Sequence, residues 1–439
     1  MKRLYLQTYG CQMNQYDSDR IARLLSRAGY VTTESAEEAD LILLNTCSVR
    51  DKAEQKVYSA LGRWRELKEK KPALLIGVGG CVAQQEGEAL LRRAPYLDLV
   101  FGTQNIHKLP EMVAAAGASD DRPVEIDFYR DPSYMEDPEG KPAVHGARAY
   151  VTIMQGCNKV CSFCIVPYVR GRELSRPSGK IVGEVEALAA GGVKEVMLLG
   201  QNVNSYGKTA PGELTFAGLL ERIDRVEGLE RVRFTTSHPE DLSPELIEAY
   251  ATLDKLCEHL HLPVQSGSDS VLKRMRRGYA CAEYLDRIRR LRARRPGIAL
   301  STDIIVGFPG ETEEEFRRTL EILQELEYDD LYAFAYSPRP HTAASKLYAD
   351  DVAEDVKRRR LSEVLELQRG ISRRKNQAMV GKVEEILVDG IAKRGRGQMT
   401  GRTRTNRIVN FTGPEDLSGR LARVRITAGG ANSLSGDLI

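Results

Sequence analysis

Residues 156–164 read GCNKVCSFC, so Cys157, Cys161 and Cys164 share one short loop. The loop directly follows Ala149–Met154, an apolar segment that is predicted to form a β-strand. Three thiolates at this spacing can bind one iron–sulfur cluster, and three ligands leave one iron of a four-iron cluster open to a substrate or cofactor. The stretch therefore predicts a metal centre at the end of a strand.

Two other interpretations of this loop stay open. A zinc ion would need a fourth ligand, for which His145 is close enough in sequence. The three cysteines could also be unrelated core thiols. The position of the loop favours the cluster, because barrel enzymes build their active sites at the C-terminal ends of the strands.

Around the loop, residues 147–370 alternate predicted strands with helical sequence. Six strand candidates occur in order: Ala149–Met154, Glu195–Leu199, Val232–Thr235, Glu258–Pro263, Ala299–Val306 and Leu331–Ala335. Helical patterns fill the intervals, for example at Gly179–Ala190, Glu283–Arg294 and Thr312–Glu325. Six successive βα units predict a partial (β/α)6 barrel rather than the closed eight-unit form.

A second alternation occupies residues 1–117. Predicted strands at Arg3–Thr8, Leu41–Asn45 and Ala73–Val78 are each followed by a helical pattern, at Ser18–Ala28, Ala53–Lys70 and Gln84–Ala94. This order predicts an α/β domain with a parallel sheet. Residues 118–146, which are rich in Asp, Glu and Pro, are predicted to be a linker with little regular structure.

Three further cysteines follow the three predicted strands of the first domain. Cys11, Cys47 and Cys81 each come within a few residues of a strand end. The carboxyl ends of parallel strands converge on one edge of a sheet, so these thiols are expected to lie together and form a second metal site. Three buried structural thiols are the alternative. Cys257 and Cys281 match no partner and are predicted to have no metal role.

The C-terminal residues, 371–439, are predicted to form a small β-barrel from short strands at Gly381–Val388, Gly397–Arg402, Ile408–Phe411 and Leu421–Ile426. This region carries 13 Lys and Arg against 6 Asp and Glu, a net charge of +7, while the whole chain has +2. A basic barrel is typical of RNA binding, and an ordinary charged surface is the alternative. The candidate RNA-binding residues are Lys393, Arg394, Arg396, Arg402, Arg404 and Arg407.

The composition of the 439 residues is that of a globular protein, with 29% charged and 42% hydrophobic residues. No apolar run approaches the roughly 20 residues that span a bilayer. The N-terminal sequence lacks the pattern of a signal peptide. A soluble, cytoplasmic protein without a membrane association is therefore expected, and clustered cysteines in that compartment favour metal binding over disulfides.

Several motifs resemble one family, the radical S-adenosylmethionine methylthiotransferases, over almost the whole length of the chain. The segments that carry the resemblance are TYGCQMN at 8–14, NTCSVR at 45–50, GCVAQ at 80–84, GCNK at 156–159, TSHP at 236–239, LPVQSGS at 262–268 and GFPGET at 307–312. That family combines a three-cysteine N-terminal domain, a CxxxCxxC barrel and a C-terminal TRAM barrel. The resemblance implies the domain limits 1–117, 147–370 and 371–439, with 118–146 as the linker.

Residues 10–14 separate the groups of this family. They read GCQMN, whereas the ribosomal-protein methylthiotransferases typically show GCPKN and the threonylcarbamoyladenosine methylthiotransferases GCKVN. The sequence is more similar to the bacterial group that acts on N6-(dimethylallyl)adenosine. The other two substrates stay as alternatives, as does a zinc-containing RNA-binding scaffold, which an iron measurement would separate from the enzymes.

The resemblance implies methylthiolation of carbon 2 of N6-(dimethylallyl)adenosine at position 37 of tRNA. It implies two [4Fe-4S] clusters, one on Cys11, Cys47 and Cys81 and one on the CxxxCxxC loop. S-adenosylmethionine would serve both as methyl donor and as source of a 5′-deoxyadenosyl radical. The implied partners are the tRNA anticodon stem-loop and a flavodoxin- or ferredoxin-like electron donor, and the protein is expected to be a monomer.

The resemblance also places S-adenosylmethionine at the ends of later barrel strands. The residues it implies for that cofactor are Gln201, Asn202, Gln265, Ser266, Gly307 and Phe308. Each could instead be a loop residue whose polar groups hydrogen-bond the backbone of its own loop. Arg170, Arg172 and Arg176 follow the cluster loop and could bind RNA phosphate or the cofactor carboxylate, or lie on a solvated surface.

Overall fold

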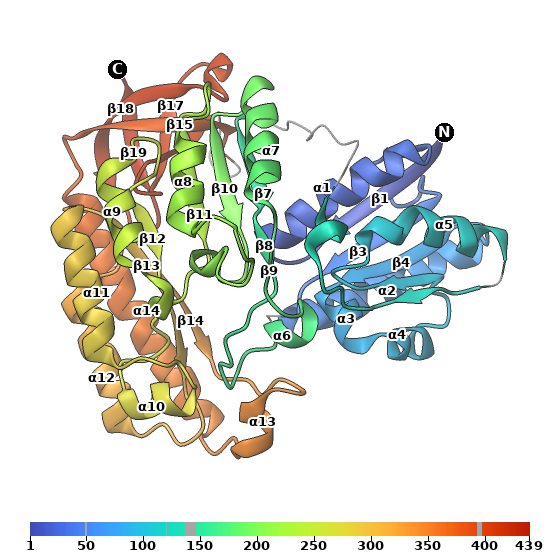
Figure 1. Cartoon of the computed structure of the whole chain (residues 1–439), viewed down its shortest axis with the longest axis horizontal. Helices are drawn as coiled ribbons and strands as arrows, with labels where there is room; N and C mark the ends of the chain where they lie inside the picture. The colour runs from blue at the N-terminus through green and yellow to red at the C-terminus, as the bar shows by residue number, and fades with distance from the viewer. Residues whose placement is uncertain (49–50, 120, 137–145, 393–396) are drawn as a thin grey trace. The chain divides into compact units, whose positions relative to one another are not determined.

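A computed structural model describes residues 1–48, 51–119, 121–136, 146–392 and 397–439 (Figure 1). The chain forms two compact units. The first consists of Met1–Ala143, Thr152–Asn158 and Ile165–Arg176. The second consists of Val144–Val151, Lys159–Cys164 and Pro177–Ile439. The chain crosses between the units within the predicted cluster loop.

The first unit is built on a six-stranded parallel sheet with strand order β2-β1-β3-β4-β5-β6. Its strands are β1 (Lys2–Thr8), β2 (Tyr30–Thr32), β3 (Leu41–Thr46), β4 (Leu75–Gly80), β5 (Leu99–Phe101) and β6 (Val124–Glu125). After β2 the chain returns to the other side of β1, so the strand order reverses between β1 and β3. Ligands of open α/β sheets bind at such a reversal, outside the carboxyl ends of the strands.

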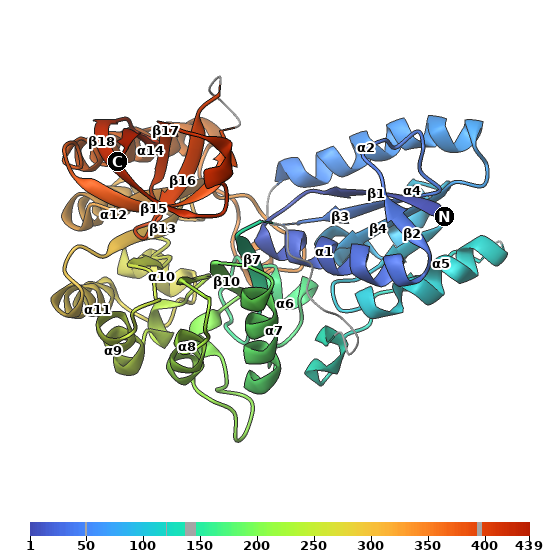
Figure 2. The same cartoon turned by 90° about the horizontal axis from the view of Figure 1, so that it is seen from above.

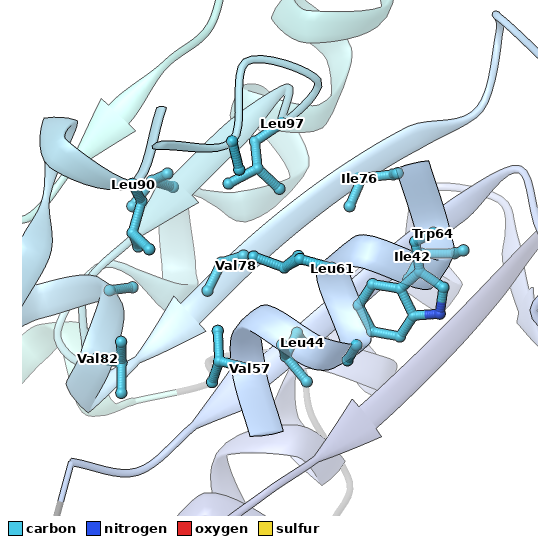
Figure 3. Packing of buried hydrophobic residues seen from close by; sticks show 14 of the residues in the cluster. Ile42, Leu44, Val57, Leu61, Trp64, Ile76, Val78, Val82, Leu90 and Leu97 are labelled. Atoms are coloured by element: carbon cyan, nitrogen blue, oxygen red, sulfur yellow. The ribbon is translucent and has the colours of Figure 1, made fainter. Parts of the chain in front are cut away.

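Helices cover both faces of this sheet. One apolar cluster joins the sheet to α2 (Asp51–Lys70), α3 (Cys81–Glu86) and α4 (Glu88–Arg93), and another joins it to α1 (Gln12–Arg27) and α5 (Leu109–Ala118). Figure 3 shows part of the first cluster, in which Leu61 and Trp64 of α2 pack with the strand residues Ile42 and Val78. The β-strands are apolar on both sides because both faces are buried.

Two helices of this unit differ from the sequence prediction. α1 begins at Gln12, six residues before the predicted start at Ser18. Cys11 and Asn14 form a capping box at this start. The hydrophobic periodicity of the sequence does not indicate it, because this stretch is mostly polar. The predicted helix Gln84–Ala94 is two helices, separated at Gly87, whose φ of +50° interrupts the helical backbone. The short strands β2, β5 and β6 were not predicted, and β6 and a 3-10 turn at Pro132–Met135 lie within the predicted linker.

The second unit contains the six predicted barrel strands. They form two three-stranded sheets, ordered β7-β10-β11 and β12-β13-β14, which a parallel bridge between Val232 and Leu256 connects. The strands are β7 (Arg148–Thr152), β10 (Glu195–Leu199), β11 (Arg231–Thr235), β12 (His259–His261), β13 (Ala299–Val306) and β14 (Asp330–Ala335). The prediction of a partial (β/α)6 barrel is therefore confirmed.

Helices alternate with these strands, as Figures 1 and 2 show. They are α7 (Ser178–Ala190), α8 (Phe216–Asp224), α9 (Pro244–Thr252), α10 (Asp269–Arg274), α11 (Cys281–Arg294), α12 (Glu313–Leu326) and α14 (Glu354–Gln377). The bounds of α7 and α11 match the predicted helices closely at their C-terminal ends. Of the helices in the described ranges, none combines the length and the apolar character needed to cross a membrane.

The C-terminal part of the second unit is a closed five-stranded barrel with strand order β15-β16-β17-β19-β18. Its strands are β15 (Val383–Ile391), β16 (Met399–Thr403), β17 (Ile408–Thr412), β18 (Leu421–Gly429) and β19 (Leu434–Leu438). Inward side chains such as Ile386, Val409 and Leu434 are fully buried. The small β-barrel is confirmed, and β19, whose sequence is interrupted by Gly and Asp, was not predicted.

Two buried arginines of β11 join this small barrel to the (β/α)6 barrel. Arg231 donates to the carbonyl oxygens of Arg402 (2.8 Å) and Glu385 (3.1 Å). Arg233 donates to the carbonyl oxygens of Arg404 (2.9 Å) and Thr403 (2.6 Å) and pairs with Glu195. Both side chains are almost fully buried, so these hydrogen bonds form away from water.

Candidate iron–sulfur and cofactor sites

Cys11, Cys47 and Cys81 lie at the carboxyl ends of three adjacent strands. Cys11 follows β1, Cys47 follows β3 and Cys81 follows β4, and β3 pairs with both of the other strands. The thiols of Cys11 and Cys47 form a hydrogen bond. The structure therefore brings these three cysteines together at the sheet reversal, as the sequence predicts.

The environment of this triad favours thiolate at Cys11 and opposes it at Cys81. The hydrogen bond with Cys47 and the nearby charge of Arg170 lower the pKa of the Cys11 thiol to about 6, although burial opposes the shift. Burial raises the pKa of Cys81, and the same Arg170 opposes that change. A cation beside several sulfurs is the arrangement that stabilises thiolate ligands.

Arg170 is buried and comes from the segment that follows the CxxxCxxC loop. Its Nη2 donates to the Asp17 carboxylate at 2.8 Å, and its guanidinium hydrogen-bonds the Cys81 thiol. Arg176 is also buried and pairs with Glu136. These partners correct the interpretation that Arg170 and Arg176 bind RNA phosphate or lie on a solvated surface, because neither guanidinium is presented to solvent. Arg172 is exposed.

Two glycines lie beside the triad at positions where a Cβ atom would collide with neighbouring residues. A Cβ on Gly10, whose φ is +154°, would lie 2.9 Å from the Cβ of Cys47. A Cβ on Gly80, whose φ is +88°, would lie 2.4 Å from the carbonyl oxygen of Thr46. No other residue fits these positions without displacing the strand ends that carry the cysteines. The donor set thus fits a cluster held by three thiolates, and the two glycines let the strand ends that carry them pack closely.

The CxxxCxxC loop begins in the first unit and ends in the second. In the first unit, the backbone N–H of Cys157 donates to the carbonyl of Gly171 at 3.2 Å. In the second unit, Arg277 donates to the Cys161 sulfur at 3.3 Å, and the backbone N–H of Cys164 donates to the carbonyl of Cys161. Arg277 is buried and also donates to the carbonyl of Pro263.

Arg277 was not predicted from the sequence. It is 116 residues from Cys161 and follows no strand, so neither spacing nor strand position marks it. Within the described ranges, no three His, Cys, Asp or Glu side chains are arranged to hold a single metal ion. A four-iron cluster makes a different demand, because each of its cysteine ligands binds its own iron.

Several buried polar atoms make no hydrogen bond within the part of the chain that the structure describes, and four of them lie in loops that follow strands of the (β/α)6 barrel. These four are Asn202 Oδ1, Ser237 Oγ, His238 Nε2 and Gln265 Oε1. All four residues follow barrel strands, namely β10, β11 and β12. Buried polar groups without partners are costly, so their recurrence at the strand ends indicates a site for a polar ligand.

The ring of His238 is neutral at physiological pH. Burial and the charge of Arg277 lower its pKa to about 2. Its Nδ1 accepts from the backbone N–H of Glu240 at 3.3 Å, which leaves the orphan Nε2 to face the ligand site as the protonated nitrogen of the neutral ring. Ser237 and His238 were missed as site residues, although their position directly after a predicted strand was a usable signal.

The remaining predicted cofactor residues have partners inside the protein. The Ser266 hydroxyl lies 3.4 Å from Thr319 Oγ1 and is fully buried. Phe308 is fully buried, with its ring 5.1 Å from that of Tyr336. Gly307 has a φ of +68°, and a Cβ there would lie 2.4 Å from Cγ of Lys357, so internal packing already explains this glycine. Gln201 directly precedes Asn202 and is half-buried.

The described arginines among the candidate RNA-binding residues have partners within the protein. Arg404 pairs with Glu258 at 2.9 Å and donates to the carbonyl of Leu256, and Arg407 pairs with Asp329 and Asn376. Their guanidinium groups contact the adjoining (β/α)6 barrel and α14. Arg402 is half-buried and donates to Asn406, while Lys393, Arg394 and Arg396 lie outside the described residues.

Three other arginines of the small barrel are exposed and were not predicted to bind RNA. Arg420, Arg423 and Arg425 form no ion pair with any described residue. Arg423 and Arg425 alternate along β18 with the buried Val424, so both point outward from the barrel. They are therefore better candidates for phosphate contacts than Arg404 and Arg407.

Replacement of Arg404 by Ala is expected to lower stability without changing RNA binding. It leaves Glu258, which is mostly buried, with one ion-pair partner fewer, at a cost of about 1–2 kcal/mol. Arg423→Ala should leave stability unchanged and should reduce the salt dependence of tRNA binding. Thermal unfolding and binding titrations at several salt concentrations measure both effects. A reduced salt slope in Arg404→Ala would contradict this assignment.

Comparison with known proteins defines the class of the chain. Residues 151–323 match the Radical SAM superfamily, residues 3–102 match the uncharacterized protein family UPF0004, and residues 377–439 match the TRAM domain. The solved structure of the radical S-adenosylmethionine methyltransferase TsrM from Kitasatospora setae covers 79% of the chain and is itself covered to 77%, with a TM-score of 0.58 and 16% identity. The match to the cobalamin-dependent S-adenosylmethionine radical enzyme OxsB covers 83% of this chain and 56% of OxsB, with a TM-score of 0.52 and 14% identity. These two structures share the fold.

Curated relatives match the chain over its full length. The tRNA-2-methylthio-N(6)-dimethylallyladenosine synthase of Geobacter metallireducens is 55% identical, with coverage of 100% of this chain and 98% of the relative. Proteins of the same name from Geobacter sulfurreducens and Chromobacterium violaceum are 54% and 50% identical, with coverage of 100% of this chain and 98% and 99% of the relatives. The chain belongs to the tRNA-2-methylthio-N(6)-dimethylallyladenosine synthase family.

Proposed function

We propose that this protein methylthiolates carbon 2 of N6-(dimethylallyl)adenosine at position 37 of tRNA. It is a radical S-adenosylmethionine enzyme that uses S-adenosylmethionine and a [4Fe-4S] cluster. The observation that carries the proposal is the full-length similarity to relatives of that name, at 50% identity or more. The two cysteine triads and the basic C-terminal barrel support it from the structure.

The residues of each triad have separate tasks. Cys157, Cys161 and Cys164 would hold the radical-generating cluster, which when bound supplies the electron that cleaves S-adenosylmethionine. The proposed second cluster would be held by Cys11 and its two neighbours at the sheet reversal. Arg277 donates to the Cys161 sulfur and Arg170 to that of Cys81, so each site contains a buried cation that offsets thiolate charge.

The strand ends of the (β/α)6 barrel would hold S-adenosylmethionine. The orphan oxygens of Asn202 and Gln265 accept hydrogen bonds and suit its amino and hydroxyl groups, while Ser237 and His238 can also donate. The neighbouring carboxylate of Asp241 is held by Asn202 and by Lys159 and fixes the orientation of the Asn202 amide. We retain Ser266, Gly307 and Phe308 as residues that shape this pocket.

Two serines give a matched test of this pocket. Ser237→Ala removes a hydroxyl that has no partner among the described residues, so the affinity for S-adenosylmethionine should fall about 3- to 10-fold with little change in stability. Ser266→Ala removes a hydroxyl that Thr319 already engages, so it should lower stability more than affinity. Anaerobic calorimetry of the cluster-loaded proteins measures the affinity. Equal losses of affinity in both variants would contradict the assignment.

The proposal includes the domain limits 1–117, 147–370 and 371–439, with 118–146 as the linker. The C-terminal barrel would bind the anticodon stem-loop through exposed arginines such as Arg420 and Arg423. A flavodoxin- or ferredoxin-like protein would donate the electrons, and the enzyme would act as a monomer.

Nucleoside analysis of tRNA from a deletion strain tests the function. We expect the strain to lack the 2-methylthio group and to accumulate N6-(dimethylallyl)adenosine, and the cloned gene should restore the methylthio group. Loss of a methylthio group from threonylcarbamoyladenosine or from a ribosomal protein would instead support one of the other substrates. Anaerobically purified protein should contain about eight iron atoms per chain. Zinc in place of iron would overturn the enzyme proposal.

A further inference from the structure

The sheet β12-β13-β14 has two faces of different character. Parallel pairing places His261 beside Ser301, Asp303 beside Tyr332 and Ile305 beside Phe334, so these residues share one face. The alternate residues of the same strands form the opposite face. Parallel sheets of this kind are usually apolar on both faces, because both are covered.

The opposite face follows that rule. Leu260, Leu300, Ile304 and Val306 are fully buried, and Leu331 is almost so. The first face does not follow it. Tyr332 is 47% exposed and Phe334 37% exposed, although both lie within a strand of a barrel. Two exposed rings at positions i and i+2 of one strand stand side by side on the same surface.

The ring of Tyr332 is held in place by its neighbours. Its centroid lies 6.0 Å from that of His261, in an edge-to-face arrangement. His261 Nδ1 lies 3.0 Å from the hydroxyl of Ser301, and the Tyr332 hydroxyl hydrogen-bonds Asp330. An exposed aromatic ring that is fixed by polar contacts loses little conformational freedom when another flat group stacks on it.

A cavity of about 400 Å³ adjoins the amino end of this face. Its lining includes Tyr332, His259 and Asp330 of the sheet together with Arg402 and Asn406 of the small barrel. The volume is in the range that holds a nucleotide-sized ligand. At the carboxyl end, the backbone N–H of Ile305 donates to the carbonyl of Gln265, a residue of the proposed cofactor pocket.

We propose that the face of β12-β13-β14 that carries Tyr332 and Phe334 binds single-stranded RNA, with a base of the anticodon loop stacked on these two exposed rings. The face adjoins the cavity shared with the small barrel at its amino end and Gln265 at its carboxyl end, and β14 itself is about 17 Å long. It would lead the loop from the C-terminal barrel to the reacting centre. This inference rests on the proposed function, because it takes tRNA as the substrate.

The chemistry of the face favours RNA over a peptide. Unpaired bases are recognised by stacking on aromatic rings together with arginine contacts to phosphate, and Tyr332 and Arg402 line the same cavity. A peptide strand would instead pair with the backbone of the edge strand β14 and would not require the rings.

Ring removal tests the proposal. In the holoenzyme, Tyr332→Ala and Phe334→Ala should each weaken binding of a fluorescent anticodon stem-loop RNA that carries N6-(dimethylallyl)adenosine, by about 5- to 100-fold. Stacking releases no counterions, so the salt dependence of binding between about 50 and 200 mM should stay unchanged. Tyr332→Phe keeps the ring and should bind like the wild type. Phe128→Ala is the control, because Phe128 is 45% exposed and does not belong to this sheet.

Three results would overturn the inference. The first is unchanged affinity in both Ala variants, and the second is equal weakening in Phe128→Ala. The third is equal weakening in Tyr332→Phe, which would show that the ring is not the binding element. Formation of 2-methylthio nucleoside by the wild type reports the proposed function separately. If the wild type converts the RNA and Tyr332→Ala still binds it with full affinity, only the stacking proposal fails.

Discussion

Simultaneous replacement of Cys157, Cys161 and Cys164 by Ala is expected to abolish methylthiolation and the formation of 5′-deoxyadenosine. About four of the eight expected iron atoms per chain should remain bound. The reason is that alanine offers no ligand, so one cluster is lost together with its open iron. The other triad keeps its own donors at the ends of three adjacent strands, where the pairing of β1, β3 and β4 and the charge of Arg170 do not depend on the loop cysteines.

Iron analysis and electron paramagnetic resonance of the triple variant measure this result, with tRNA binding as a check that the protein is folded. Cys281→Ala is the matched control, because this half-buried cysteine has no place in either triad. It should keep all iron and both activities. Loss of all iron from a folded triple variant would show that the six cysteines form one shared site rather than two.

Cys47→Ala should separate the two activities. We expect it to keep the formation of 5′-deoxyadenosine from S-adenosylmethionine and reductant and to lose methylthiolated tRNA by at least about 100-fold. Cys47 is buried, hydrogen-bonds Cys11 and follows β3 in the first unit, so its loss removes one of three thiolates from the N-terminal site. The radical-generating site keeps Cys161 and its contact with Arg277.

Both products are measured in one anaerobic reaction. Cys257→Ala serves as the control, since Cys257 is buried and lies next to β12, and burial raises the pKa of its thiol. It should retain both activities. Full methylthiolation by Cys47→Ala, or its loss in Cys257→Ala, would show that the N-terminal triad is assigned wrongly.

Local sequence patterns predicted the elements that carry the sites. β10 and β13 have the predicted bounds, because each is rich in β-branched and other apolar residues and lies between clear breaks. The three N-terminal cysteines could be assigned to one edge because parallel strands end together, a rule that needs no tertiary detail. The start of α1 was missed, since its first turns contain several polar residues that are buried, such as Asn14 and Asp17, and the sequence shows no continuous apolar stripe there.

Charged side chains were harder to assign, because their partners are distant in sequence. Arg170 meets Asp17 across 153 positions, and Arg404 meets Glu258 across 146. Nothing in the local sequence distinguishes such buried arginines from Arg423, which is exposed. The position of Ser237 and His238 after a predicted strand was a signal in the sequence, but the lack of a partner for their buried polar atoms is a property of the fold alone.

The arginine contacts of β11 affect how this chain can change. Arg231 and Arg233 bind main-chain oxygens of residues 402–404, and every amino acid supplies that oxygen. Substitutions at those positions therefore leave these three acceptors in place. These backbone contacts between the two barrels thus persist when exposed side chains of the small barrel change, so its outer surface can vary while this part of the attachment remains.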